Sequence, residues 1–130
     1  MRDIIRHLPN VAGKREPLVK KVLEWTPSYH ASHITGVTSA YDGSEIDGDF
    51  YTVPLFPQQI TGLDRQLVLG RIIDACKLAE ADGAQIVGLG GYTSVVGSAG
   101  LTVAKEMDIA VTSGNSYTVA TAVEGATKAC

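Results

Sequence analysis

The sequence has little of what several large protein classes require. Its two cysteines, Cys76 and Cys130, are too few for a disulfide framework or a four-ligand zinc site. Lysine and arginine number 11 against 14 Asp and Glu and are scattered, which argues against nucleic-acid binding. The longest apolar run, near residues 84–89, is far shorter than a membrane span. No basic segment leads into an apolar stretch as in a signal peptide. We therefore expect one cytoplasmic globular domain of 130 residues, without nucleic-acid or membrane partners.

The first half of the chain predicts a helix and a β-hairpin. Glu16-Pro17 marks a helix start, because proline suits the first helical turn, and apolar residues then recur at helical spacing up to Pro27. Residues 33–39 and 50–55 are rich in β-branched and aromatic side chains. The Tyr-Asp-Gly-Ser segment at 41–44 favours a turn between them. An antiparallel hairpin is therefore expected.

The second half predicts alternating helices and strands. Thr61 is the expected N-cap of a long helix that ends near Asp82. Apolar runs at 84–89 and 109–112 predict short strands, the first of them covered on both sides. Further helices are expected at 101–106 and 116–129, the last with Val119, Val123 and Ala126 facing inward. Because right-handed crossovers make such strands parallel neighbours, we predict an α/β fold. Its small, mostly parallel mixed sheet would be sandwiched by helices, with the hairpin in the N-terminal half.

Two loops rich in glycine and hydroxyl side chains follow the two predicted strands. In open α/β sheets ligands bind beyond the carboxyl ends of strands. The N–H groups and hydroxyls of these loops suit a carbonyl, carboxylate or phosphate. The alternative is structural, with glycines for tight turns and Ser, Thr and Asn as helix caps. The predicted substrate-binding residues are Gly90, Gly91, Tyr92, Thr93, Ser94, Thr112, Gly114, Asn115, Ser116 and Thr118.

The first loop is similar to a dinucleotide-binding fingerprint but departs from it. Counted from Gly88, the motif G-x-G-x-x-G needs glycine where Thr93 stands. No acidic residue follows at a second strand end, where ribose binding needs one, since Asp108 precedes its strand. The loop therefore predicts no nicotinamide site of its own.

No catalytic residue or metal site is predicted from the remaining reactive side chains. Cys76 lies on the apolar face of its helix, which favours a small buried hydrophobe over a thiol nucleophile. His30 and His33 lie at a strand entry, where their spacing gives little support for a metal site. Asp47 and Asp49 are interpreted as part of an exposed strand face rather than as an acid–base pair.

Two motifs in this order resemble the N-terminal domain of long-chain acyl-[acyl-carrier-protein] reductases, whose bacterial homologues are often labelled shikimate-dehydrogenase-like. Gly-Leu-Gly-Gly-Tyr-Thr-Ser stands at 88–94, within the matching run 83–96. Gly-Asn-Ser-Tyr-Thr stands at 114–118, within 111–120, although Thr112-Ser113 departs from the usual paired threonines. The hairpin and residues 101–105 are similar too, so the resemblance covers the chain from about His33 onward.

The resemblance implies one substrate-side domain, residues 1–130, similar to the N-terminal domain of amino-acid dehydrogenases. It would be excised from a longer chain in which a Rossmann domain binding NADP follows Cys130. The implied parent is an oxidoreductase that converts a fatty acyl thioester to an aldehyde, and this chain alone would be inactive. The acylated cysteine of such reductases follows the Rossmann domain, so Cys76 does not inherit its role. Shikimate oxidation is not implied, because the matching stretch Asn115-Ser116-Tyr117 lacks the required Asp.

Two alternatives stay open. In the first, the chain is a domain of an NAD(P)-linked dehydrogenase from the superfamily of these reductases and binds a small polar substrate. In the second, it is a non-catalytic module. Such a module would dimerise or bind a partner, because an uncovered cleft face exposes apolar surface. The pocket separates the first alternative from the acyl reductase: an apolar tunnel suits acyl chains, and a short polar pocket suits hydroxy acids.

Overall fold

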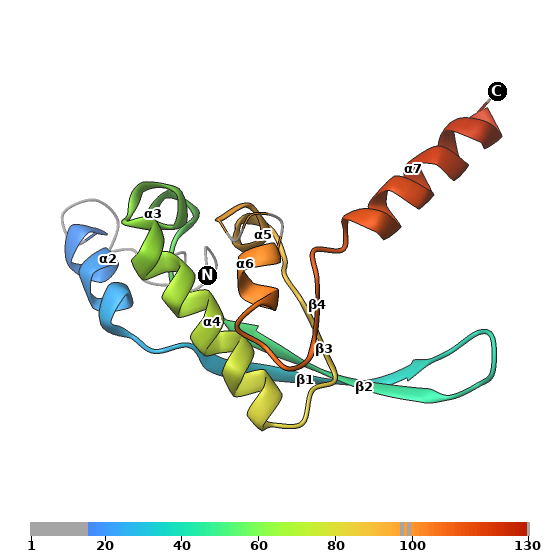
Figure 1. Ribbon diagram of the computed structural model, residues 1–130, viewed down its shortest axis with the longest axis horizontal. Helices are drawn as coiled ribbons and strands as arrows, with labels where there is room; N and C mark the ends of the chain where they lie inside the picture. Colours follow the sequence, from blue (N-terminus) through green and yellow to red (C-terminus); the bar gives the residue numbers. More distant parts are fainter. Residues whose placement is uncertain (1–15, 97, 99, 130) are drawn as a thin grey trace.

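The structure, a computed structural model, describes residues 16–96, 98 and 100–129. Its elements are α2 (Glu16–Trp25), β1 (Tyr29–Thr38), β2 (Glu45–Thr52), α3 (Pro57–Gly62), α4 (Arg65–Ala81), β3 (Ile86–Gly88), α5 (Tyr92–Val96), α6 (Leu101–Ala104), β4 (Ala110–Thr112) and α7 (Asn115–Ala129) (Figure 1). The expected helices and strands follow one another in the expected order, with the short helices α3 and α5 in addition, and the fold is of the α/β class. No helix in this described part of the chain is both long and apolar enough to cross a membrane.

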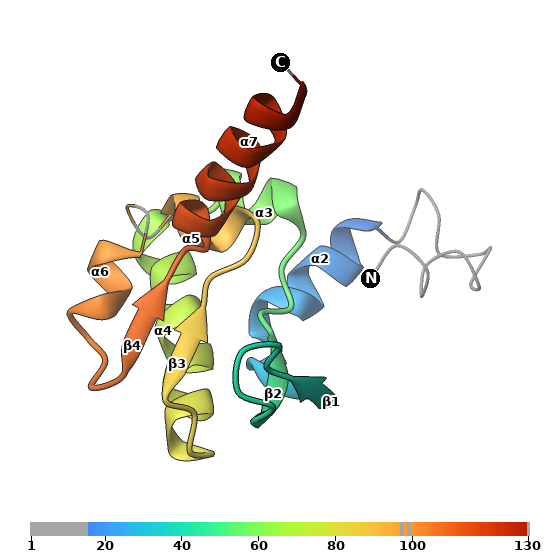
Figure 2. The ribbon, with the colours of Figure 1, turned by 90° about the vertical axis from the view of Figure 1, so that its right-hand side faces the viewer.

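The strands form two separate sheets rather than the single mixed sheet that the sequence predicted. β1 and β2 pair antiparallel, and β3 and β4 pair parallel. Figure 2 shows β3 beside β4, with β2 standing apart from them. The expectation that the run 84–89 is covered on both sides is also wrong, because Ile86 is 61% exposed. Within the residues that the structure describes, β3 is paired on one edge, with β4.

The hydrophobic core is built around α4. This helix buries Val68, Ile72, Ala75, Cys76 and Ala79. Leu55, Leu89 and Val103 complete the buried cluster from the segment after β2, the strand end of β3 and α6. The buried face of α4 therefore packs against segments that adjoin both sheets, and α4 is the element that joins them.

The start of α4 differs from the predicted one. Asp64, and not Thr61, is its N-cap: the carboxylate accepts hydrogen bonds from the N–H groups of Gln66 and Leu67 at 3.0 and 3.1 Å. Thr61 belongs to the preceding short helix α3, where its hydroxyl donates to the Pro57 carbonyl. Leu63, whose backbone is extended, ends α3 and separates it from α4.

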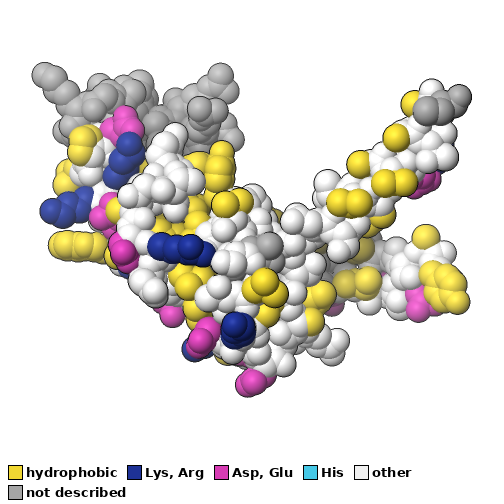
Figure 3. Space-filling view, turned by 45° about the horizontal axis from the view of Figure 1, so that its top comes forward, with side chains coloured by type: hydrophobic (Ala, Val, Ile, Leu, Met, Phe, Trp, Pro, Cys, Tyr) yellow, Lys and Arg dark blue, Asp and Glu magenta, His cyan; other side chains and the backbone are white. Residues whose placement is uncertain are grey.

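The helices at the two ends of the described chain have no fully buried side chain, although Val19 and Leu23 of α2 are half-buried. Neither α2 nor α7 has a buried residue. The prediction that Val119 and Val123 face inward is wrong, since they are 62% and 61% exposed. Figure 1 shows α7 projecting from the body, and Figure 3 shows hydrophobic side chains along it. The apolar spacing of α7 therefore has no partner within the described residues.

Candidate functional site

Parallel pairing of β3 and β4 brings the two glycine-containing loops to one sheet edge. Val87 lies opposite Val111 and Gly88 opposite Thr112. One step beyond the strand, the Leu89 N–H donates to the Thr112 carbonyl at 2.7 Å. Both strands therefore end at the same level and in the same direction. The loops leave the sheet side by side, which is the arrangement the sequence predicted.

Each loop turns into its helix at a glycine with left-handed backbone. Gly91, with φ of 54°, precedes α5, and Gly114, with φ of 72°, precedes α7. Side chains other than glycine rarely adopt such angles. The first N–H groups of a helix have no acceptor within it, and both α5 and α7 begin at this edge of the sheet.

The hydroxyl groups of the loops are already used in local turns. Thr93 Oγ1 donates to the Gly90 carbonyl at 2.7 Å, and Ser94 Oγ donates to the Gly91 carbonyl at 3.0 Å. In the second loop, Thr112 Oγ1 accepts from the Gly114 N–H at 3.1 Å. These bonds support the structural interpretation of the hydroxyls. Each hydroxyl oxygen that donates keeps lone pairs for accepting, whereas its proton is occupied.

A pocket of about 890 Å³ adjoins the first loop. Residues 46–53 form one side, residues 84–91 form the other, and α4 lies between them as a floor. Of the predicted binding residues, Gly90, Gly91 and Thr93 line it. Seven others lie outside its lining, namely Tyr92, Ser94, Thr112, Gly114, Asn115, Ser116 and Thr118. The second loop is thus beside the first loop but not against the pocket, and the binding role of both remains a prediction.

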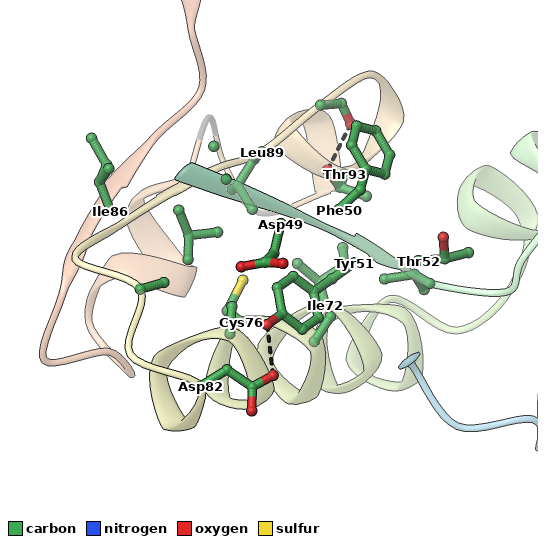
Figure 4. A pocket seen from close by; sticks show the side chains of 18 of the residues that line it. Asp49, Phe50, Tyr51, Thr52, Ile72, Cys76, Asp82, Ile86, Leu89 and Thr93 are labelled. Atoms are coloured by element: carbon green, nitrogen blue, oxygen red, sulfur yellow. Dashed lines mark hydrogen bonds between the residues drawn. The ribbon is translucent and has the colours of Figure 1, made fainter. Parts of the chain in front are cut away.

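The polar side chains of the pocket are held in their protonated or paired forms. Asp49, Tyr51 and Cys76 lie together between β2 and α4 (Figure 4). The Tyr51 hydroxyl donates to Asp82 Oδ2 at 2.6 Å, and this bond raises the pKa of Tyr51 to about 12. Burial raises the pKa of the Cys76 thiol to about 11. The interpretation of Cys76 as a small buried hydrophobe is confirmed, since it is 3% exposed and has little thiolate near neutral pH.

Sequence reasoning missed a cluster of two histidines and a carboxylate on the hairpin. Asp49 Oδ1 lies 2.8 Å from His30 Nε2 and 2.7 Å from His33 Nδ1. The His33 hydrogen bond holds the pKa of Asp49 low, and the same bond raises the pKa of His33. The signal lies in the register: His30 pairs with Tyr51 and His33 with Asp49, with a register shift between His30 and Ser32. A bulge there turns both rings to one face, where simple alternation would separate them.

The imidazole of His33 can exchange a proton, and Asp49 favours its protonated form by raising its pKa. All three side chains are exposed, and both imidazoles point at one carboxylate oxygen. Among the residues that the structure describes, no group of three or more His, Cys, Asp or Glu side chains is placed to hold a metal ion.

Comparison with known proteins finds part of this sequence in a longer protein. No protein family model matches the chain. The aminotransferase PigE of Serratia sp. (strain ATCC 39006) is 37% identical over 82 residues, which are 63% of this chain. The same match spans 9% of PigE. The chain is therefore similar to a small part of a much longer protein.

This relative corrects the class of enzyme that the sequence led us to expect. We had described the chain as an oxidoreductase of the NADP-linked, acyl-reductase-like and shikimate-dehydrogenase-like kind. PigE is an aminotransferase, which contradicts that description. The match does not bear on the position of the two loops, which follows from the pairing of β3 with β4.

Proposed function

We propose that this chain is a substrate-binding domain of a larger enzyme, and that its two loops bind an oxygen of a carbonyl-bearing substrate. The observation that carries the proposal is the parallel register of β3 and β4, which sets both glycine turns at one edge. Two sets of N–H groups from different loops can then converge on one oxygen atom. Preorganised donors of this kind bind an oxygen that carries negative charge.

The chemistry of the substrate follows from the donors and the pocket. Gly90, Gly91 and Thr93 line a pocket whose floor is apolar, from Ile72 to Ala79 of α4. A ligand with an oxygen at the loops and an apolar portion along the floor fits these surroundings. An acyl thioester meets both requirements, since it has a carbonyl oxygen for the loops and an apolar chain for the floor. The similar protein PigE is named an aminotransferase, and because aminotransferases exchange an amino group with a 2-oxo group, a 2-oxo acid is a second ligand to test.

The residues present do not fit a nicotinamide dinucleotide. Thr93 stands where the third fingerprint glycine is needed, and its hydroxyl is bonded to the Gly90 carbonyl. Its side chain occupies the place where glycine allows a helix to pack closely on its strand. No step of binding by this chain therefore involves NADP.

Calorimetric titration of the chain tests the proposal. The probes are an octanoyl thioester of N-acetylcysteamine and a short 2-oxo acid. We expect the thioester to bind, and Asn115→Ala to weaken binding by up to about tenfold, the value of one good hydrogen bond. Thr127→Val is the matched control, because Thr127 lies on α7 far along the helix and its hydroxyl bonds to Val123. Absence of heat with either probe, at millimolar concentration, would contradict the proposal.

A second candidate function is supported by α7. Tyr117, Val119 and Val123 expose apolar side chains on a helix that projects from the body (Figure 3). Exposed apolar surface of this kind marks an interaction site. A non-catalytic module that dimerises through α7 would show a concentration-dependent mass in analytical ultracentrifugation, lost on Val119→Asp, and would bind neither probe.

A further inference from the structure

The β1–β2 hairpin has one polar face and one apolar face. Residues directly opposite each other in an antiparallel pair point to the same side, and successive residues of a strand alternate. Asp49 and Tyr51 of β2 therefore share one face with their partners His33 and His30. The other face holds four cross-strand pairs, namely Tyr29 with Thr52, Ser32 with Phe50, Ile34 with Gly48 and Val37 with Ile46. None of these side chains is charged, so this second face is the apolar face of the hairpin.

The polar face, and not the apolar face, lies towards α4. The Tyr51 hydroxyl donates to Asp82 at the end of α4, and Figure 4 shows Phe50 on the opposite side of the strand from Asp49 and Tyr51. Antiparallel sheets with one solvated face ordinarily pack the apolar face on the core. Here the apolar side chains are between 42% and 61% exposed, namely Ile34, Val37, Ile46 and Phe50. An exposed apolar face on a sheet of only two strands suits the binding of a partner.

The helix α7 carries a second exposed apolar face. Its apolar side chains recur at spacings of three and four residues and share one side of the helix, namely Val119, Ala122, Val123 and Ala126. On the other side, Lys128 Nζ lies 2.6 Å from Glu124 Oε1. Figures 1 and 2 show α7 and the hairpin as two separate projections from the body. Within one chain the two apolar faces therefore do not cover each other.

Charge favours α7 of a second copy over a second hairpin as the occupant of the hairpin's apolar face. Residues 29–52 include Asp42, Glu45, Asp47 and Asp49 but no Lys or Arg. Two hairpins packed on each other would bring these carboxylates together, and like charges disfavour association. The charges of α7, Glu124 and Lys128, neutralise each other. A helix with one apolar stripe is also an ordinary cover for an apolar sheet face.

We propose that two copies of this chain associate by exchange, with α7 of each copy packed on the apolar face of the other copy's hairpin. A two-fold axis forms both contacts at once and closes the assembly. This inference rests on α7 as an interaction site, which is the second candidate function, and it holds whether or not the loops bind a ligand. Below the dissociation constant the chain is a monomer with both faces exposed.

Sedimentation velocity of the whole chain over a range of concentrations tests the exchange. Val37→Asp charges the hairpin face and Val119→Lys charges the α7 face; both side chains are exposed, so circular dichroism should show an unchanged fold. Each variant alone has both contacts altered, which should raise the dissociation constant about a hundredfold. A mixed dimer keeps one contact unchanged and pairs Asp with Lys in the other, so the mixture should associate about tenfold more tightly than either variant alone.

Matched controls lie on the opposite faces of the same two elements. Thr38→Asp is on the polar face of β1 and Thr121→Lys is on the side of α7 away from Val119, so both should leave the dissociation constant unchanged. A wild-type chain that stays monomeric at millimolar concentration would overturn the proposal. So would a mixture no tighter than the single variants, because each face would then pair with its own like. A dimer that only Val119→Lys dissociates would keep α7 as an interaction site but overturn the hairpin as its partner.

Discussion

The helices α4 and α7 are nearly equal in length, at 17 and 15 residues, yet they differ completely in burial. α4 buries five side chains and contacts α3, α5, α6 and both hairpin strands. α7 buries none and projects from the end of β4 (Figure 1). Both segments show apolar residues at helical spacing. The difference teaches that this spacing predicts a helix, whereas burial depends on a partner element placed against it.

The largest expected effect on stability is the removal of a core side chain from α4, compared with the same kind of change on α7. Ile72→Ala, at a residue 2% exposed, should lower the free energy of unfolding by about 2–5 kcal/mol through lost burial and a cavity. Val123→Ala on α7 should change it by less than about 0.5 kcal/mol. Urea denaturation of both variants measures the difference. Equal effects would mean that α7 packs on the body in solution.

Alanine substitution at the two glycines with positive φ, one in each loop, should affect different properties of the protein. Gly91→Ala and Gly114→Ala each place a side chain at positive φ, at about 1–2 kcal/mol. α5 contacts α4, so Gly91→Ala should lower global stability, while Gly114→Ala should mainly reduce the helicity of α7 seen by circular dichroism. Gly90→Ala is the matched control, because no atom lies within 4 Å of its added Cβ and its φ is not positive. A loss for Gly90→Ala as large as for Gly91→Ala would refute strain as the cause.

The N-cap residue of α4 should contribute less to the free energy of unfolding than the core residues of this helix do. Asp64→Ala removes the acceptor of two N–H groups and should lower the free energy of unfolding by about 1 kcal/mol. Asp64→Asn keeps an oxygen acceptor and should retain most of the stability. Thermal denaturation at neutral pH compares them. No loss in the alanine variant would show that water replaces the cap.

The cluster of His30, His33 and Asp49 on the hairpin should have the smallest effect on the free energy of unfolding, and this effect should depend on pH. Its hydrogen bond with Asp49 raises the pKa of His33 above 6.5, so the folded state binds a proton more tightly. The resulting stability is present below pH 6.5 and is lost as pH rises through the folded pKa. His33→Gln should flatten the unfolding free energy over that range. If the unfolding free energy of the wild-type protein changed as little between pH 6 and 8 as that of the variant, the contact of His33 with Asp49 would not be formed in solution.

The elements that the sequence predicted are those with local signals. The apolar face around Ile72 and the paired runs that became β3 and β4 followed from spacing, and the shared edge of the loops followed from handedness. The division into two sheets has no local signal, because strand pairing depends on contacts between residues far apart in the sequence. The contact of His30 with Asp49 depends on a bulge of one residue, which no alternation pattern shows.

The central claim is that the two loops after β3 and β4 bind one oxygen-bearing ligand. Titration of the ¹⁵N-labelled chain with the octanoyl thioester, followed by amide chemical shifts, tests it most directly. We expect saturable shifts at residues 90–94 and 112–118 together, with the hairpin tip and the far end of α7 unchanged. Shifts confined to one loop or to α7, or no shifts at millimolar ligand, would contradict it.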